Sequence, residues 1–179
     1  MFYEGLRLPA SLRARFNLMP HPVGPNPRLG KVESRRALGL DEHGRYIGLA
    51  ASIDSRKAVG EFLQAFRAAT SRPTDRLILA GFVNGTHLRT IQDSYGDLVA
   101  SGRLIVRNEF LSPETYQTVL SALDVVCTPY PGFMGLSATL LEGLAAGRPV
   151  LTNSEGWCDA VLRRFSAGWS CDVRDHAAF

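Results

Sequence analysis

The sequence predicts an α/β fold, an open parallel sheet with helices on both faces, and three observations lead to it. Short apolar runs of the kind that form buried strands alternate with segments of helical periodicity along most of the chain. The loops between these segments are short, which is typical of strands joined by crossover helices. The 179 residues, 45% of them hydrophobic, are enough for one domain with its own core.

The expected elements alternate in chain order. Helices are expected over 32–40, 57–69, 86–99, 112–123, 138–146 and 155–165, and strands over 46–51, 76–82, 103–106, 124–130, 149–151 and 168–171. The helix over 57–69 is assigned from apolar residues at helical spacing, which are Val59, Phe62, Leu63 and Phe66. The helix over 112–123 carries start signals, with proline at its first position and an acidic residue in its first turn.

The stretch from Asp124 to Asn153 is the most informative part of the chain. It reads as a strand, a glycine-rich turn over 129–135, a helix, a turn and another strand. Ser137 stands where the N-cap of that helix belongs. Because a glycine-rich turn that leads into a helix offers free backbone N–H groups, this stretch predicts an anion site, with phosphate as the natural ligand.

Within residues 1–44, the part from Met1 to about Lys31 does not resemble the start of a domain. The segment 21–27 is a proline-rich linker, and the region is expected to hold linker and short helices that lead out of an absent N-terminal domain. The regular α/β pattern begins at Arg45, so the domain is expected over 45–179.

Composition excludes several classes of protein. The net charge is +3 and the arginines are scattered, which indicates a solvated surface and no nucleic-acid partner. No apolar run is long enough for a transmembrane segment, and no signal peptide is recognisable. The three cysteines have no metal-binding spacing and fit free thiols, which favours a cytoplasmic protein without a metal site. These cysteines are Cys127, Cys158 and Cys171.

Ligands of open parallel sheets bind at the carboxyl ends of the strands. Four loops are expected to converge there, over 52–57, 81–85, 108–112 and 130–137. The loop after the first strand has no G-x-G-x-x-G pattern, and the chain has no G-x-x-x-x-G-K-[ST] motif. Their absence argues against a dinucleotide-binding protein and against a P-loop protein.

Five segments in a fixed order carry a resemblance to a known family. They are Ile53–Lys57, Leu77–Gly81, Phe110–Glu114, Tyr130–Glu142 and Gly147–Val150. With them the chain from Arg45 to Asp172 resembles the C-terminal, nucleotide-sugar-binding domain of retaining GT-B glycosyltransferases, the group 1 superfamily that includes glycogen- and sucrose-synthase-like enzymes. The resemblance implies a single Rossmann-like half-domain whose ligand is a nucleoside-diphosphate sugar, with no cofactor and no metal.

The same resemblance implies roles for individual residues. Lys57 would pair with the donor diphosphate, and Arg56 could supply a second cation. The backbone of Gly135, Leu136 and Ser137 would bind the same diphosphate at the helix N-terminus. Glu142 would accept hydrogen bonds from the ribose hydroxyls, and Phe110 and Leu111 would flank the base. No catalytic residue is assigned.

Structural alternatives exist for each of these residues. Lys57 could be a solvated lysine at a helix start, Gly135 could serve only its turn, and Ser137 could cap its helix as well as contact the ligand. Glu142 lies among leucines, so its carboxylate needs either a ligand or a buried donor from the protein.

Three departures from the family pattern leave two functions open. Met134 stands where the family has a carboxylate that approaches the transferred sugar, Ser52 stands where an arginine is expected, and no acceptor-binding half precedes the domain. The first hypothesis is a donor-binding domain for hexosyl transfer to an unknown acceptor, completed by a separate N-terminal half-domain. The alternative is a non-catalytic nucleotide-binding or assembly module descended from such a half.

Overall fold

The structure is a computed structural model that describes residues 23, 29–69, 72, 74–175 and 178. The proline-rich linker predicted over 21–27 and the preceding N-terminal residues lie outside the described residues, apart from Val23. Six strands form one sheet, in which every neighbouring pair is parallel. They are β1 (Arg45–Ala50), β2 (Asp75–Ala80), β3 (Leu104–Arg107), β4 (Val125–Thr128), β5 (Val150–Thr152) and β6 (Gly168–Ser170).

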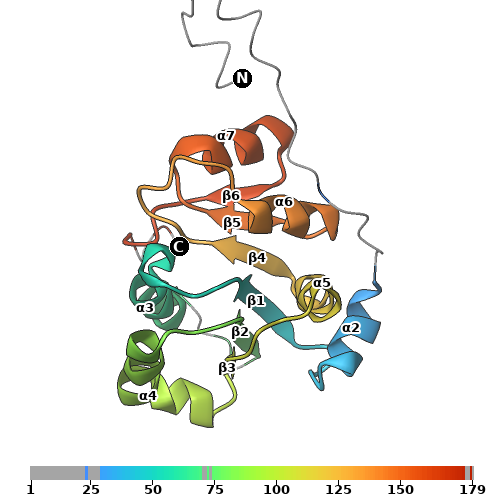
Figure 1. Cartoon of the computed structure of the whole chain (residues 1–179), viewed down its shortest axis with the longest axis vertical. Coiled ribbons are helices and arrows are strands. Elements are labelled where there is room, and N and C mark those ends of the chain that lie inside the picture. Colours follow the sequence, from blue (N-terminus) through green and yellow to red (C-terminus); the bar gives the residue numbers. More distant parts are fainter. Residues whose placement is uncertain (1–22, 24–28, 70–71, 73, 176–177, 179) are drawn as a thin grey trace, which may run out of the picture.

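The strand order is β3-β2-β1-β4-β5-β6 (Figure 1). This is the order of the doubly wound, Rossmann-like fold, in which the chain winds first in one direction from β1 and then in the other. The predicted fold class is therefore confirmed. In the described residues no helix is both long and apolar enough to cross a bilayer.

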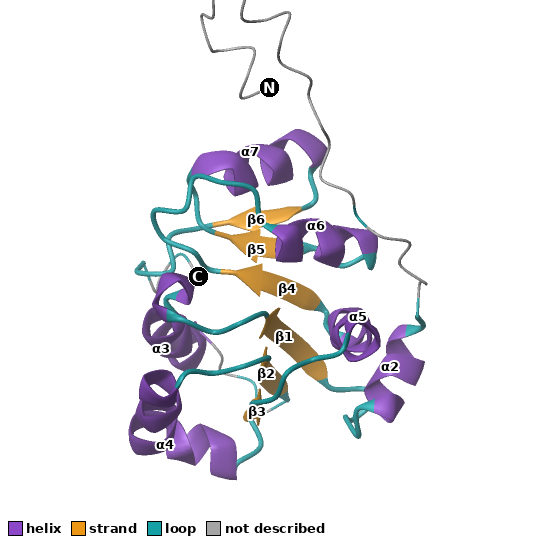
Figure 2. Cartoon of the chain, in the orientation of Figure 1, coloured by secondary structure: helices purple, strands orange, loops and turns teal. Residues whose placement is uncertain are grey.

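Helices cover both faces of the sheet (Figure 2). They are α2 (Lys31–Ala37), α3 (Val59–Ala69), α4 (Gly85–Ala100), α5 (Pro113–Ala122), α6 (Ala138–Ala145) and α7 (Gly156–Phe165). Helices α3 and α4 lie on one face, and α2, α5, α6 and α7 on the other. Successive side chains of β2 alternate between the two cores: Leu77 and Leu79 pack with α3 and α4, and Ile78 and Ala80 with the opposite helices.

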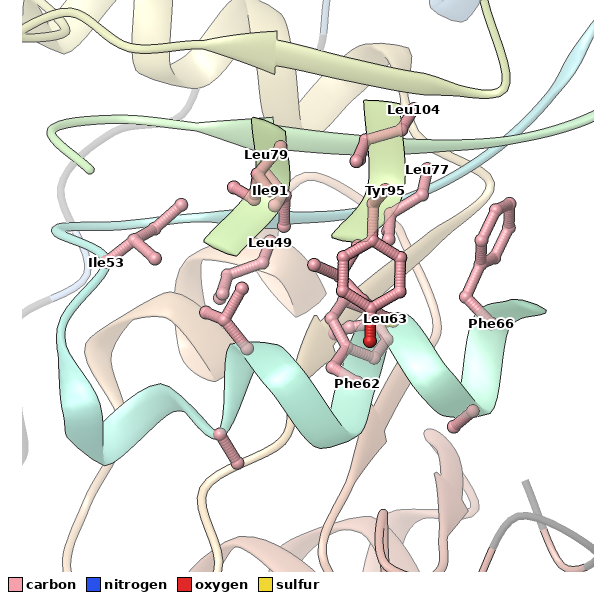
Figure 3. Close-up of a cluster of buried hydrophobic side chains, with 14 of the residues drawn as sticks. Leu49, Ile53, Phe62, Leu63, Phe66, Leu77, Leu79, Ile91, Tyr95 and Leu104 are labelled. Carbon is pink, nitrogen blue, oxygen red and sulfur yellow. The ribbon is translucent and has the colours of Figure 1, made fainter. Parts of the chain in front are cut away.

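The apolar spacing predicted for 57–69 is what packs α3 onto the sheet. Phe62, Leu63 and Phe66 are fully buried, and Figure 3 shows them between the helix and the side chains of the neighbouring strands. Burial of a large apolar side chain contributes about 1.5–3 kcal/mol. This cluster therefore fixes α3, and with it the loop that leads into α3 from β1.

The start of that helix differs from the prediction. Residues Ser55–Lys57 form a separate 3-10 turn, η1, in which the Arg56 amide donates to the Asp54 carboxylate. Ala58 follows with φ 45°, a left-handed conformation, so α3 begins only at Val59. Lys57 is therefore not on an α-helix, because the side chain of Asp54 closes a tight turn before it.

Helix α2 is tied to the rest of the fold through Asp124, the residue before β4. The Asp124 carboxylate pairs with Arg35 at 2.6 Å and with Lys31 at 2.8 Å, and it accepts the Tyr46 amide at 2.8 Å. Arg35 is 4% exposed and also donates to the Ala122 carbonyl at 3.0 Å. Residues 31–37 thus pack on the domain, while the domain limit at Arg45 stays a prediction.

A close approach of two backbones shapes the loops at the carboxyl ends of β1 and β2. Gly81 follows β2 with φ 123°, and a Cβ added there would lie 2.0 Å from the Ala51 carbonyl oxygen. The Ala51 amide also donates to the Ala80 carbonyl at 2.9 Å. Only glycine fits this position, so the loops after β1 and β2 have a fixed spacing.

We expect Gly81→Ala to lower the free energy of unfolding by about 3 kcal/mol or more, because it adds both backbone strain and a clash with backbone that cannot move away. Gly60→Ala is the matched control. A Cβ at Gly60 meets nothing within 4 Å in α3, so this change should be neutral or stabilise by up to about 1 kcal/mol. Urea denaturation of both variants checks the prediction, and equal effects would contradict it.

The Asp124 network should make stability depend on pH. Burial raises the pKa of Asp124, but the Lys31 bond, the Tyr46 amide and the Arg35 charge outweigh it, so the pKa is lowered overall. Because the pKa is lower in the folded protein, the Asp124 carboxylate stabilises the fold when the pH is above its pKa in the unfolded chain, about 3.9. This contribution is lost as the pH falls through the pKa of the folded protein.

Asp124→Asn should therefore cost about 2 kcal/mol of unfolding free energy at neutral pH, because Arg35 stays buried without its partner. The difference from wild type should shrink in acid, where the wild-type carboxylate is itself protonated. Denaturation curves at about pH 7 and about pH 3 measure the two differences. A gap of the same size at both values would show that the charge of Asp124 contributes nothing.

Candidate functional site

The sheet has one switch point, between β1 and β4. From β1 the chain proceeds outward to β2 and β3, and it then returns to β4 on the other side of β1. The loops that leave β1 and β4 therefore lead to helices on opposite faces of the sheet (Figure 1). In this fold ligands bind at such a switch point, in a crevice at the carboxyl ends of the strands. The loop after β1 ends in η1, and the loop after β4 leads into α6.

A direct contact closes the base of this crevice. Lys57, the last residue of η1, places its Nζ 3.7 Å from the ring centroid of Tyr130, which follows β4. Tyr130 is 5% exposed, and its hydroxyl faces the Ser137 and Thr139 side chains at the start of α6 without reaching hydrogen-bond geometry to either. Tyr130 thus contacts Lys57 through its ring and approaches the amino end of α6 through its hydroxyl, while anion binding there stays a prediction.

The charge of Lys57 is only partly compensated by the protein. Burial lowers the pKa of Lys57 and the Arg56 guanidinium adds to this, while Asp54 and Cys158 act in the opposite direction. Asp54 is already paired with Arg56, because its carboxylate accepts hydrogen bonds from Arg56 Nε and Nη2. The distance from Nη2 to Asp54 Oδ2 is 2.6 Å. In the part of the chain that the structure describes, no carboxylate lies within ion-pairing distance of Lys57.

Arg56, the second predicted cation, points into solvent beside Asp54. Its side chain is 74% exposed, and the Asp54 hydrogen bond raises its pKa. The structure therefore places Arg56 next to Lys57 on η1 but pairs it within its own turn. Its role in binding a diphosphate stays a prediction.

The amino end of α6 has the cap that the sequence predicted. Ser137 is buried and its Oγ accepts the Leu140 amide at 3.2 Å. The Thr139 hydroxyl donates to the Ala50 carbonyl at 3.5 Å, which joins the first turn of α6 to the end of β1. The first N–H groups of a helix have no acceptor within it, so this end carries a partial positive charge beside Lys57.

The loop that carries Gly135 and Leu136 is held by the start of α7. The Gly132 amide donates to Glu155 Oε1 at 2.6 Å, and the Trp157 amide donates to the Met134 carbonyl at 3.3 Å. Gly156 has φ 75°, and a Cβ there would lie 2.7 Å from the Phe133 carbonyl oxygen. These restraints could not be predicted from the sequence, because they join segments that no local pattern connects.

Glu142 has a polar neighbour within the protein. It lies on α6, half-buried, beside Tyr116 of α5. Burial raises the pKa of the Tyr116 hydroxyl, the Glu142 carboxylate raises it further, and the Thr139 hydroxyl has the opposite effect. Tyr116 thus offers the protein donor that the structural alternative requires, and the ribose role of Glu142 stays a prediction.

The two residues expected near the base separate in the structure. Phe110 is 93% exposed in the loop between β3 and α5, whereas Leu111 packs partly buried against the core beneath α5. Only Phe110 is therefore fully available to a ligand. Tyr130 lies deeper than either of them.

Other features of the described residues do not point to a different centre. No group of three or more His, Cys, Asp or Glu side chains in them is arranged to hold a metal ion. Cys127, Cys158 and Cys171 are all free thiols. Two hollows of about 430 and 500 Å³ lie at the amino ends of the strands, the edge opposite the crevice. Ligands of parallel sheets bind at the carboxyl edge, so we assign the site to the crevice.

Comparisons with known proteins agree with the fold and identify the family. The family model described as glycosyl transferases group 1 matches residues 44–179. Among curated proteins, the chain is 29% identical over 136 residues to the lipopolysaccharide core biosynthesis mannosyltransferase LpsB of Rhizobium meliloti, covering 73% of this chain and 37% of the relative. The chain spans only about a third of the length of the curated relatives it matches.

Two solved structures share the fold. The glycosyltransferase WaaG, involved in lipopolysaccharide biosynthesis, superimposes with a TM-score of 0.70 at 18% identity, covering 94% of this chain and 45% of WaaG. HepE of Anabaena, solved in complex with UDP, gives a TM-score of 0.64 at 16% identity, covering 83% of this chain and 40% of HepE. With the family match, these likenesses show that the chain belongs to the glycosyl transferases group 1 family and has the fold of a GT-B C-terminal domain.

Proposed function

We propose that this chain binds a nucleoside-diphosphate sugar in the crevice between β1 and β4 and acts as the donor half of a retaining glycosyltransferase that transfers a hexosyl group. One observation carries the proposal. The Lys57 ammonium contacts the ring of Tyr130, and the hydroxyl of that ring faces the first residues of α6. A half-buried ammonium without a carboxylate partner, beside a helix N-terminus, is a site for an anion. HepE, which shares the fold, was solved with UDP.

The proposed chemistry is electrostatic. When the bond between sugar and diphosphate breaks, negative charge grows on the diphosphate that leaves. Lys57 and the first amides of α6 would stabilise that charge more strongly than the charge of the bound donor, which lowers the barrier. Because these groups supply the positive charge, the proposed reaction requires neither a metal ion nor a cofactor.

Glu142 is the residue that we propose for binding the ribose of the donor. It lies one helical turn beyond Thr139, whose hydroxyl contacts the carboxyl end of β1. A carboxylate accepts more than one hydrogen bond, so Glu142 can bind ribose hydroxyls while it keeps its contact with Tyr116. The exposed ring of Phe110 would then stack near the base.

The transfer itself would need a second, acceptor-binding half-domain. Several large apolar side chains are exposed in the loops at the carboxyl ends of β2, β3 and β4, and burial against a partner would remove them from water. They are Phe82, Phe110, Phe133, Met134 and Leu136. We propose that this rim faces a separate N-terminal half-domain and that the assembled enzyme works in the cytoplasm.

A non-catalytic nucleotide-binding or assembly module is the second candidate. Two residues favour it, because Met134 and Ser52 stand where the family pattern has a carboxylate and an arginine. Such a module would bind the nucleotide through the same Lys57 site but would transfer no sugar. Hydrolysis or transfer of a labelled donor sugar, measured with a candidate N-terminal half present, separates the two functions.

Lys57→Ala should weaken UDP or GDP binding about 10- to 100-fold, because a charge-assisted bond to phosphate contributes about 1.5–3 kcal/mol. Isothermal titration measures the affinities. Lys31→Ala is the matched control, since Lys31 is the only other lysine and lies on α2 in contact with Asp124. Wild type that binds neither nucleotide, or equal affinities of both variants, would argue against the proposal.

Glu142→Ala should weaken UDP binding about 10-fold but leave inorganic pyrophosphate binding unchanged, because the carboxylate would contact the ribose of the donor and not its diphosphate. Wild type should bind 2′-deoxy-UDP more weakly than UDP, whereas Glu142→Ala should bind the two nucleotides with equal affinity. Glu114→Ala, an exposed glutamate in the first turn of α5, serves as control. A loss of pyrophosphate binding in Glu142→Ala would show instead that Glu142 supports the fold of the site.

A further inference from the structure

Lys57 and Tyr130 come from opposite sides of the switch point. Lys57 ends the 3-10 turn after β1, and Tyr130 ends the buried segment after β4, yet the ammonium lies 3.7 Å above the ring centroid. This distance is well inside the range of cation–π contacts, which extends to about 6 Å. The contact is therefore a direct bridge between the two loops that form the crevice.

The ring of Tyr130 cannot move independently of its surroundings. It is 5% exposed, belongs to the core beneath α3 and meets Phe133 edge-on with ring centroids 5.9 Å apart. Its hydroxyl faces the side chains of Ser137 and Thr139, the residues that begin α6. The position of the ring is thus coupled to the amino end of α6.

Among the residues that the structure describes, none binds Lys57 more strongly and would hold it elsewhere. The charged groups that face it are Asp54 and Arg56 on its own turn, and these pair with each other at 2.6 Å. From α7 the thiol of Cys158 acts on it, and from the β4 loop the ring of Tyr130. An ammonium that is half withdrawn from water is stabilised by an aromatic face without losing its net charge.

We propose that Tyr130 is a positioning residue, whose ring holds the Lys57 ammonium over the amino end of α6 so that a diphosphate meets both together. This proposal rests on the proposed function for its ligand. The side chain would lose less conformational freedom on binding than a lysine in solvent, which is how preorganisation raises affinity. The ring itself need not contact the donor.

The contact can be measured without any ligand. The chain has two lysines, so an NMR spectrum of lysine side chains labelled at Cε shows two signals. The ring should move the Lys57 signal upfield from that of Lys31, and Tyr130→Phe should keep this shift while Tyr130→Leu abolishes it. Coincident Lys57 and Lys31 signals in the wild-type protein would overturn the proposal, even if Tyr130→Leu fails to fold.

UDP binding then tests the consequence for the site. Tyr130→Phe should bind UDP within about 3-fold of wild type, and Tyr130→Leu should bind about 10-fold more weakly. In a Lys57→Ala background the same Tyr130→Leu change should have no further effect, because the ring acts through the lysine. An equal loss in both backgrounds would mean that Tyr130 only supports the loop.

The two proposals fail in different ways. Wild type that binds no UDP, GDP or pyrophosphate, but shows the ring shift at Lys57, would contradict the donor-binding function and leave the contact established. Wild type that binds UDP with the same affinity as Tyr130→Leu would contradict the positioning role alone.

Discussion

The structure depends on the point where the parallel sheet reverses its winding direction. Because β1 and β4 are neighbours and their crossover helices leave toward opposite faces, the two loops between them cannot pack against each other along their length. Lys57 of one loop contacts Tyr130 of the other. The site therefore depends on tertiary structure, which brings the ammonium of one loop to the helix start that follows the other.

Several backbone restraints keep this meeting point in place. On one side, Gly81 lets the loop after β2 approach Ala51 closely, and buried Phe62 and Phe66 fix the helix that follows η1. On the other side, Glu155 and the first turn of α7 hold the glycine-rich turn after β4. These hydrogen bonds restrict the conformational freedom that the glycines give the turn. The amides at the start of α6 therefore have a defined orientation.

Much of the fold was predictable, because its determinants are local. The helical spacing around Phe62, the cap at Ser137 and the proline–acid start of α5 each identify an element within a few residues of its observed bounds. The order of strands and helices then favours the parallel sheet. Short-range physical rules were sufficient here because strand, turn and helix preferences all agree along the chain.

The site was less predictable, because it is made of contacts between distant segments. Lys57 was expected on a helix, but the Asp54 cap and the left-handed Ala58 set it on its own turn. The Tyr130 contact, the Glu155 restraint and the Tyr116 neighbour of Glu142 join residues that no periodic pattern relates. A sequence pattern indicates which residues carry charge, whereas the tertiary structure decides whether that charge already has a partner.

Binding of a nucleoside diphosphate at Lys57 can be tested by differential acetylation of the two lysines. The protein is treated with a limiting amount of acetylating reagent, with and without UDP or GDP, and modification is quantified by mass spectrometry. The account predicts that the nucleotide protects Lys57 and leaves Lys31, paired with Asp124 at the opposite edge of the sheet, unchanged. Equal modification of Lys57 with and without saturating nucleotide would contradict it.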